Sequence, residues 1–272
     1  MEFSKACSAY SRMKNLPYLY GNNGKNERRR LELLGEAHDA ASIALCNRAR
    51  EMVTVRKVLE IGPGSGSLIV KLCSLWPGVH FRALDIEVTH LDASLRSMVT
   101  VGTIESAPFS DNEFDLCHAR LVLSHVTDLQ GSLAELHRIT KPNGIVIVEE
   151  LDHQRPQVFQ SKVMASYRKA LAAHAKGFSY DRHLGSNLVE AVSENGKFRT
   201  IYYESREIVG TGPEHPICQI HLMSVDTSGF ELTNRGLLST KELVAVKNEL
   251  LKTSDKHPLV SSPMIGVIFR RI

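Results

Sequence analysis

The sequence has few cysteines, and they form no metal-binding or redox pattern. The five are an odd number, lie far apart in the chain and make no Cys-x-x-Cys pair. They are Cys7, Cys46, Cys73, Cys117 and Cys218. This scatter argues against a disulfide framework or a zinc site and favours a reducing compartment. The chain also lacks a His-x-x-x-His pattern or similar ligand cluster, so we expect no bound metal ion.

Long apolar runs and an excess of one charge are missing as well. No apolar run approaches the roughly 18 residues of a membrane-spanning helix, and residues 1–13 lack the apolar core of a secretion signal. The 33 basic and 30 acidic side chains leave a formal net charge of +3, which is too balanced for a nucleic-acid-binding surface. We therefore expect a cytoplasmic protein without a membrane or nucleic-acid partner.

The chain contains an alternation of short apolar runs and amphipathic segments. Such repetition of strands and helices predicts a parallel sheet in an α/β fold. The expected strands are residues 57–61, 79–84, 98–104, 114–118, 145–149, 198–209 and 264–270. The expected helices are residues 26–52, 67–76, 89–95, 129–139, 158–176, 186–193, 216–224 and 240–251.

The turn after the first expected strand carries the strongest functional signal. Glu60 is followed at alternate positions by Gly62, Gly64 and Gly66, and an apolar helix begins near Leu68. Glycine adopts backbone conformations that other residues avoid and lets a ligand approach the main chain. A strand, a glycine turn and a helix in this order predict a small-molecule site at a helix N-terminus.

Two cofactor classes use such a turn. Dinucleotide sites have Gly-x-Gly-x-x-Gly, but Ser67 stands where that pattern has Gly or Ala. The spacing E-x-G-x-G-x-G instead resembles the first motif of the class I S-adenosylmethionine-dependent methyltransferases. Asp85 ends the second expected strand, 19 positions after Gly66, where its carboxylate could accept the ribose hydroxyls of either cofactor.

The segment at residues 101–109 separates the two classes. It is similar to the "G-D-A-x-x-L-P-F" region of the methyltransferase family, which covers the adenine. Thr103 stands where the family usually has Asp, so the adenine contact would use the Thr103 hydroxyl or the backbone at Ile104 and Glu105. The resemblance also implies that Ala119 and Arg120, at the end of the fourth strand, lie beside the methionine part of the cofactor.

The resemblance implies a Rossmann-like, doubly wound α/β fold with a mostly parallel seven-stranded sheet. It implies an N-terminal lid and helix at residues 1–52, a cofactor-binding core at 53–152, and a cap with a C-terminal β-hairpin at 153–272. Residues 18–21 and 27–31 resemble the N-terminal pattern of a bacterial natural-product methyltransferase subgroup, which implies a lid that places Tyr18 over the cofactor. This N-terminal arm could also exchange between subunits of a homo-oligomer.

The expected site contains cofactor-binding residues and three candidates for a general base. A base is needed only if the acceptor must lose a proton. His125 matches a histidine found after strand four in many small-molecule methyltransferases, and Glu149 and Glu150 lie where strand five ends. The expected cofactor-binding residues are Tyr18, Glu60, Gly62, Pro63, Gly64, Gly66, Asp85, Ile86, Thr103, Ile104, Glu105, Ala119 and Arg120.

We predict methyl transfer from S-adenosylmethionine to an O, N or C nucleophile of a small acceptor, and the N-terminal resemblance favours a secondary metabolite. An NAD-linked Rossmann oxidoreductase is one alternative, but no Tyr-x-x-x-Lys pair follows the fourth strand. A module that binds S-adenosylmethionine without methyl transfer is another, which Thr103 leaves open. The cap could line an acceptor pocket with Phe159, Tyr167, Phe178, Tyr180, Tyr202 and Met223.

Overall fold

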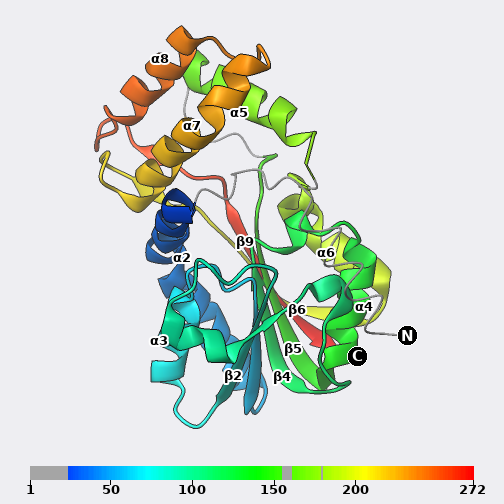
Figure 1. Ribbon diagram of the computed structural model, residues 1–272. Helices are drawn as coiled ribbons and strands as arrows, with labels where there is room; N and C mark the ends of the chain where they lie inside the picture. Colours follow the sequence, from blue (N-terminus) through cyan, green and yellow to red (C-terminus); the bar gives the residue numbers. More distant parts are fainter. Residues whose placement is uncertain (1–23, 155–160, 179) are drawn as a thin grey trace.

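The computed structural model describes residues 24–154, 161–178 and 180–272, with side chains from residue 26 onward (Figure 1). Tyr18 and most of the expected lid therefore lie outside the described residues, and so does Phe159. The described chain forms a central sheet covered by helices on both faces, with a helical cap beyond one end of the sheet. No helix in this described part is long and apolar enough to cross a membrane.

The central sheet has seven strands in the order β3-β2-β1-β4-β5-β9-β6. Strands β1 to β5 pair in parallel, whereas β9 runs antiparallel to both β5 and β6. This order confirms the predicted doubly wound, mostly parallel seven-stranded fold. The strands are β1 (Lys57–Ile61), β2 (His80–Asp85), β3 (Val99–Val101), β4 (Phe114–Arg120), β5 (Thr140–Leu151), β6 (Phe198–Arg206) and β9 (Met264–Arg271). A separate two-stranded sheet pairs β7 (Val209–Gly210) with β8 (Leu259–Val260).

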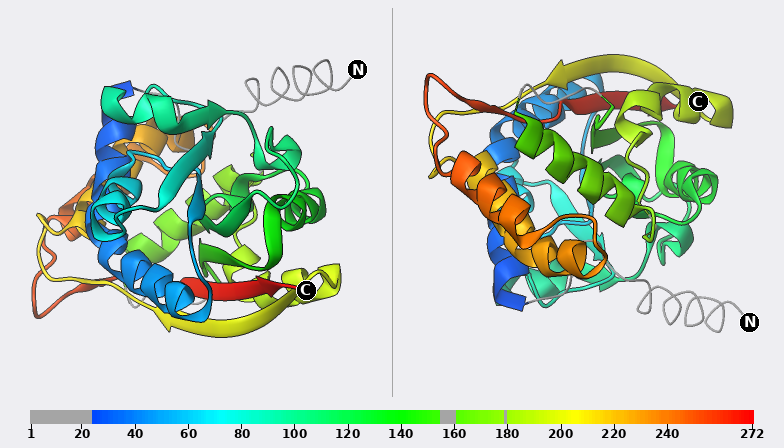
Figure 2. Two further views of the ribbon diagram at one scale, coloured as in Figure 1. Left: turned by 90° about the horizontal axis from the view of Figure 1, so that it is seen from below. Right: turned by 90° about the horizontal axis from the view of Figure 1, so that it is seen from above.

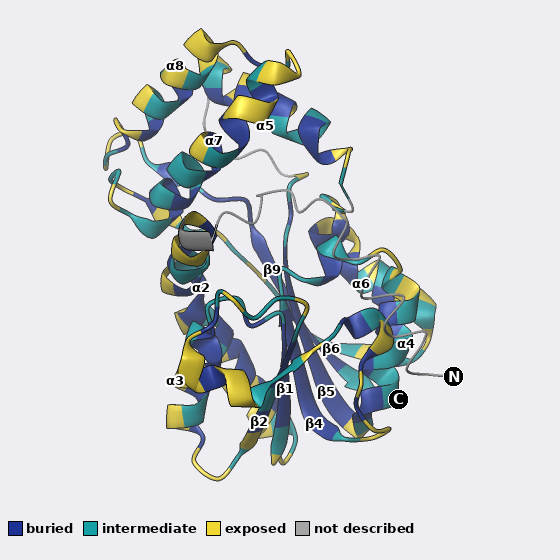
Figure 3. Cartoon of the chain, in the orientation of Figure 1, coloured by how far each residue is buried: buried dark blue, intermediate teal, exposed yellow. Residues whose placement is uncertain are grey.

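Alternate residues of the central strands enter two different apolar layers. Leu59 of β1 packs in the layer under α4 (Leu129–Ile139) and α6 (Leu184–Asn195). Val58 packs in the opposite layer, under α2 (Gly24–Met52) and α3 (Ser67–Leu75). The central strands β1, β4 and β5 are consequently buried on both faces (Figure 3), as expected for a parallel sheet between helices.

The cap consists of α5 (Lys162–Ala175), α7 (Pro216–Asn234) and α8 (Thr240–Leu250). These helices share a third apolar core, which Leu33 of α2 joins. Figure 2, in the view from above, shows them lying over the end of the sheet. Because α2 packs on the sheet and also on α7, it connects the core to the cap.

Several predicted boundaries were wrong by a few residues or more. The helix expected at 216–224 extends to Asn234, because Gly229 does not break it but packs closely, its virtual Cβ 3.1 Å from Leu243 Cδ1 of α8. The third strand ends at Val101, since Thr103 caps the 3-10 helix η2 (Ile104–Ser106). The short helix expected at 89–95 is the 3-10 helix η1 (Ala93–Met98), and the strand expected at 198–209 ends at Arg206.

Candidate active site

A cavity of about 430 Å³ lies between the carboxyl ends of the parallel strands and the cap. Its lower part is lined by the turn after β1, the end of β2 and the segment after β3. Its upper part is lined by side chains of α5 and α7 and by residues around positions 180 and 261. The size suits a small-molecule site, and the carboxyl ends of the strands are where such folds bind ligands.

The glycine turn has the geometry that the sequence predicted. The φ angles of Gly62, Gly64 and Gly66 are +63°, +57° and +82°, a left-handed region that other residues adopt only with strain. A Cβ at Gly62 would lie 2.4 Å from Val122 Cγ2. Gly62, Pro63 and Gly64 line the cavity. Gly66 does not line it but is the N-cap of α3, where the turn ends.

Asp85 lines the lower part of the cavity at the end of β2. Burial raises its pKa to about 6, although backbone N–H groups of Glu87, Ile86 and Gly64 oppose the rise. One of these N–H groups, that of Glu87, donates to Asp85 Oδ1 at 3.0 Å. No cationic side chain of the described residues forms an ion pair with this carboxylate, so it can accept hydrogen bonds from hydroxyl groups of a ligand.

The segment after β3 is divided between the cavity and a neighbouring loop. Thr103 and Ile104 line the cavity, as does Ile86 after β2. The Thr103 hydroxyl accepts the Glu105 N–H at 3.2 Å. Glu105 does not line the cavity, because its carboxylate accepts the backbone N–H groups of Thr127 and Asp128 ahead of α4.

The end of β4 places Arg120 in the cavity and Ala119 in the apolar core below it. The Arg120 guanidinium donates to Asp39 Oδ1 and to the Ser42 hydroxyl of α2, each at 2.9 Å. Arg120 therefore fastens α2 to the sheet beside the cavity.

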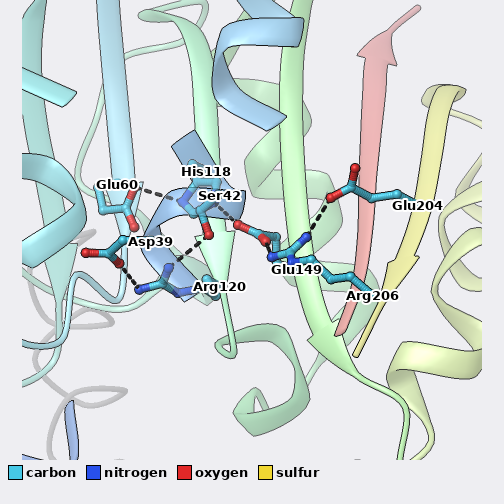
Figure 4. A network of polar contacts seen from close by, with 8 residues as sticks. All are labelled: Asp39, Ser42, Glu60, His118, Arg120, Glu149, Glu204 and Arg206. Carbon is cyan, nitrogen blue, oxygen red and sulfur yellow. Dashed lines mark hydrogen bonds and ion pairs between the residues drawn. The ribbon is translucent and has the colours of Figure 1, made fainter. Parts of the chain in front are cut away.

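Glu60 and Glu149 belong to a buried polar network under the cavity and do not line it (Figure 4). His118 lies between them on the same face of the sheet, with Nδ1 2.8 Å from Glu60 and Nε2 2.8 Å from Glu149. Burial alone would lower the pKa of His118, but the two carboxylates raise it to about 9. Burial alone would raise the pKa of Glu149, but His118 and Arg206 hold it well below its usual range.

Glu150 also points away from the cavity. It accepts the backbone N–H groups of Val122 at 3.0 Å and Ser124 at 3.2 Å, and burial raises its pKa to about 7. These bonds fix the 3-10 helix η3 (Leu123–His125), which presents His125 to the cavity. Neither Glu149 nor Glu150 faces the space where an acceptor would lie.

His125 is the one base candidate of the three that lines the cavity. Its ring stacks on Tyr180, with centroids 4.7 Å apart. Burial lowers the pKa of His125 to about 4, with a further contribution from the charge of Arg30. The imidazole is consequently neutral at pH 7, and its low pKa makes it a weak base in the free protein.

Sequence reasoning missed other polar side chains of the upper cavity. His153 contacts the Tyr180 hydroxyl at 2.9 Å and the Ser262 hydroxyl at 3.0 Å. His221, Arg168 and Arg182 also line this part. A signal for Arg168 was present, since Met164, Tyr167, Arg168 and Leu171 follow the i, i+3, i+4, i+7 pattern of one helix face. Of the aromatic and Met residues expected in the pocket, Tyr167, Phe178 and Tyr180 line it, and Tyr202 and Met223 do not.

Comparisons with known proteins agree with this geometry. Residues 59–148 match the family model described as a methyltransferase domain. A malonyl-[acyl-carrier protein] O-methyltransferase of Erwinia billingiae is 36% identical over 107 residues, which are 35% of this chain and only 39% of that protein. The enzyme of the same name from Yersinia pestis is 24% identical and aligns over 98% of this chain and 89% of its own.

A solved structure shares the fold. A protein of Bacillus halodurans assigned as a methyltransferase superposes with a TM-score of 0.55 at 15% identity, covering 85% of this chain and 98% of its own. Strand order, glycine turn and sequence match together show that residues 59–148 lie in a class I S-adenosylmethionine-dependent methyltransferase domain. The family match confirms the predicted enzyme class and the predicted cofactor, S-adenosylmethionine.

Proposed function

We propose that this protein transfers the methyl group of S-adenosylmethionine to an O, N or C nucleophile of a small acceptor. One observation carries the proposal: a single cavity joins the glycine turn and Asp85 to a chamber lined by the cap. A cofactor held at the lower end and an acceptor held at the upper end would therefore share one cavity.

The residues of the lower cavity fit this cofactor. The left-handed glycines bring the backbone to the cavity wall, and Asp85 offers a carboxylate that no described cation neutralises. Asp85 would hold the ribose hydroxyls, and Thr103 with Ile104 would lie at the adenine. Bound S-adenosylmethionine supplies an electrophilic methyl group on a sulfonium centre. The chain's own task is then to position the acceptor and to exclude water.

The acceptor's chemistry decides whether a base takes part. His125 is the base candidate for an O–H or N–H acceptor, since it lines the cavity, but its pKa of about 4 makes it a weak base in the free protein. Glu149 and Glu150 are not included in this proposal, because their carboxylates hold His118 and the backbone of η3. The names of the two O-methyltransferase relatives favour an oxygen nucleophile.

We further propose that the chain has three parts: a lid and helix up to residue 52, a cofactor-binding core up to residue 152, and a cap after it. The acceptor would be a secondary metabolite. The scattered cysteines favour a cytoplasmic location. Subunit exchange through the N-terminal arm is also part of the proposal, and residues 1–23 of that arm lie outside the described chain.

Titration calorimetry with S-adenosylhomocysteine, with NADH as the comparison, tests the cofactor half of the proposal. We expect heat with S-adenosylhomocysteine and none with NADH, and weaker binding by Asp85→Ala. Transfer of radiolabelled methyl groups to a panel of small acids, phenols and amines tests the acceptor half. No heat with S-adenosylhomocysteine would refute the proposal, and tight binding without turnover on any acceptor would favour a non-transferring module.

A further inference from the structure

The cavity has an unequal distribution of charge along its length. Among the described residues, four arginines line it, and two of these are matched by carboxylates. Arg30 forms two bonds to Glu27, at 2.6 and 2.8 Å, and both side chains are buried. Arg120 pairs with Asp39 at 2.9 Å. The charges of these two arginines are therefore locally compensated.

Arg168 of α5 and Arg182, just before α6, differ from that pair. Neither has a hydrogen-bond or ion-pair partner in the part of the chain that the structure describes. Both side chains are half-buried and both line the upper cavity. Two guanidinium groups in such a position lose part of their hydration without gaining a counter-charge.

The two arginines act on the same chamber. Burial lowers the pKa of Arg168, and the positive charge of Arg182 lowers it further. Arg168 also lowers the pKa of His221, and Arg182 lowers that of His153, in each case after the larger effect of burial. Both histidines line the cavity as well, so the two cations are close enough to affect each other and the groups between them.

Among the described residues, no carboxylate lines the upper cavity beside these arginines, and the buried Asp152, which acts on His153, lies outside the lining. The lining carboxylates are those of Glu27, which pairs with Arg30, and of Asp85 and Glu87 near the glycine turn. Guanidinium groups bind carboxylates and phosphates through charge-assisted hydrogen bonds, which are stronger than neutral ones. The uncompensated charge therefore suits an anionic group of the ligand itself.

Apolar side chains lie beside the two arginines. Met164 and Leu171 flank Arg168 on the same helix face, and Ile217 and Ile220 reach the cavity from α7. A ligand that fills the chamber would thus place an oxyanion at the arginines and hydrocarbon against these residues.

We propose that the acceptor is an amphipathic molecule whose oxyanion group, a carboxylate or a phosphate, binds between Arg168 and Arg182. This inference rests on the proposed function, because it assigns the acceptor to the upper cavity. It adds a substrate class, and it makes the two arginines specificity-determining residues.

Three probes of equal chain length test the proposal: octanoate, octyl phosphate and octanamide. Calorimetry on protein saturated with S-adenosylhomocysteine should show binding of at least one anion, and octanamide should bind at least about tenfold more weakly, as expected for the loss of hydrogen bonds to charged groups. The anion that binds more tightly identifies the carboxylate or the phosphate as the source of the charge.

Variants then assign the binding to the arginines. Arg168→Gln and Arg182→Gln should each weaken binding of the preferred anion by about tenfold or more. Lys169→Gln is the matched control, because Lys169 is the next residue of α5, is exposed and does not line the cavity. It should bind the anion as the wild type does.

Three results would overturn the inference: failure of both anions to bind, equal binding of octanamide, or unchanged anion binding by both arginine variants. Affinity for S-adenosylhomocysteine is measured separately in every variant, together with the urea midpoint of unfolding. If S-adenosylhomocysteine itself fails to bind the wild type, the proposed function fails, and the anion titration repeated on the protein alone still decides the role of the arginines.

Discussion

The change Glu149→Gln should destabilise the protein without removing a catalytic group. Glu149 is fully buried and contacts His118 at 2.8 Å and the Arg206 guanidinium (Figure 4). Its replacement leaves two cationic groups with one carboxylate fewer in a region closed to water. We expect the free energy of unfolding at pH 7 to fall by about 3 kcal/mol.

The size of this loss follows from the partners that survive. Breaking a buried ion pair typically costs about 3–5 kcal/mol. In the variant, His118 would still contact Glu60 at 2.8 Å and Arg206 would still pair with Glu204 at 2.6 Å. We therefore expect a loss at the lower end of this range. Glu204→Gln is the matched control, since it changes the other carboxylate on Arg206. Its side chain is 28% exposed, and removal of such an ion pair should cost less than about 1 kcal/mol.

Urea unfolding followed by circular dichroism measures both variants, and an unchanged slope would show that the loss is one of stability. The folded Glu149→Gln protein should keep its affinity for S-adenosylhomocysteine, because Glu149 does not line the cavity. The reasoning is refuted if the free energy of unfolding of Glu149→Gln lies within about 1 kcal/mol of the wild-type value. It is also refuted if Glu149→Gln is no less stable than Glu204→Gln.

Three further predictions follow from the site. At Gly62 the φ angle is +63°, and an added Cβ would lie 2.4 Å from Val122 Cγ2. Gly62→Ala should therefore weaken binding of S-adenosylhomocysteine in calorimetry. The control Gly78→Ala has φ +82° but no atom within 4 Å, and should lose only about 1–2 kcal/mol of stability. Affinity for S-adenosylhomocysteine should fall as the pH drops below about 6, where Asp85 takes up a proton, and this dependence should disappear in Asp85→Asn. The pKa of His118 is raised to about 9, so its contribution to stability is complete below about pH 6.5 and is lost as the pH rises through 9; urea midpoints should show this slope in the wild type but not in His118→Gln.

The fold could be predicted because its signals are local. The run ending in Glu60 and the glycines after it specify a strand and a turn, and alternation of such units with helices specifies a parallel sheet. The glycine turn and Asp85 could be predicted for the same reason, since each follows directly from the end of a strand. The structure places these residues at one end of one cavity.

The partners of buried charges could not be predicted, because they depend on the register between strands. Glu60 looked like a cofactor ligand, but pairing of β1 with β4 puts it opposite His118. The alternation of strand residues could not predict whether Glu149 or Glu150 faces the cavity. In the structure both carboxylates are engaged in hydrogen bonds, on opposite faces of β5. The contribution of Arg182 was equally hidden, because it enters the chamber from a loop.

The charge of the upper cavity bears on the need for a base. The pKa values of His125, His153 and His221 are about 4, 3 and 4, so these imidazoles are neutral at pH 7, and the positive charge there comes from the arginines. An acceptor carboxylate bound by arginine is already ionised and, as the nucleophile, would have no proton to lose. A phenol or amine acceptor would still need one removed. Whether the nucleophile is this carboxylate or a separate O–H or N–H group of the acceptor therefore decides whether His125 acts as a base or only lines the chamber.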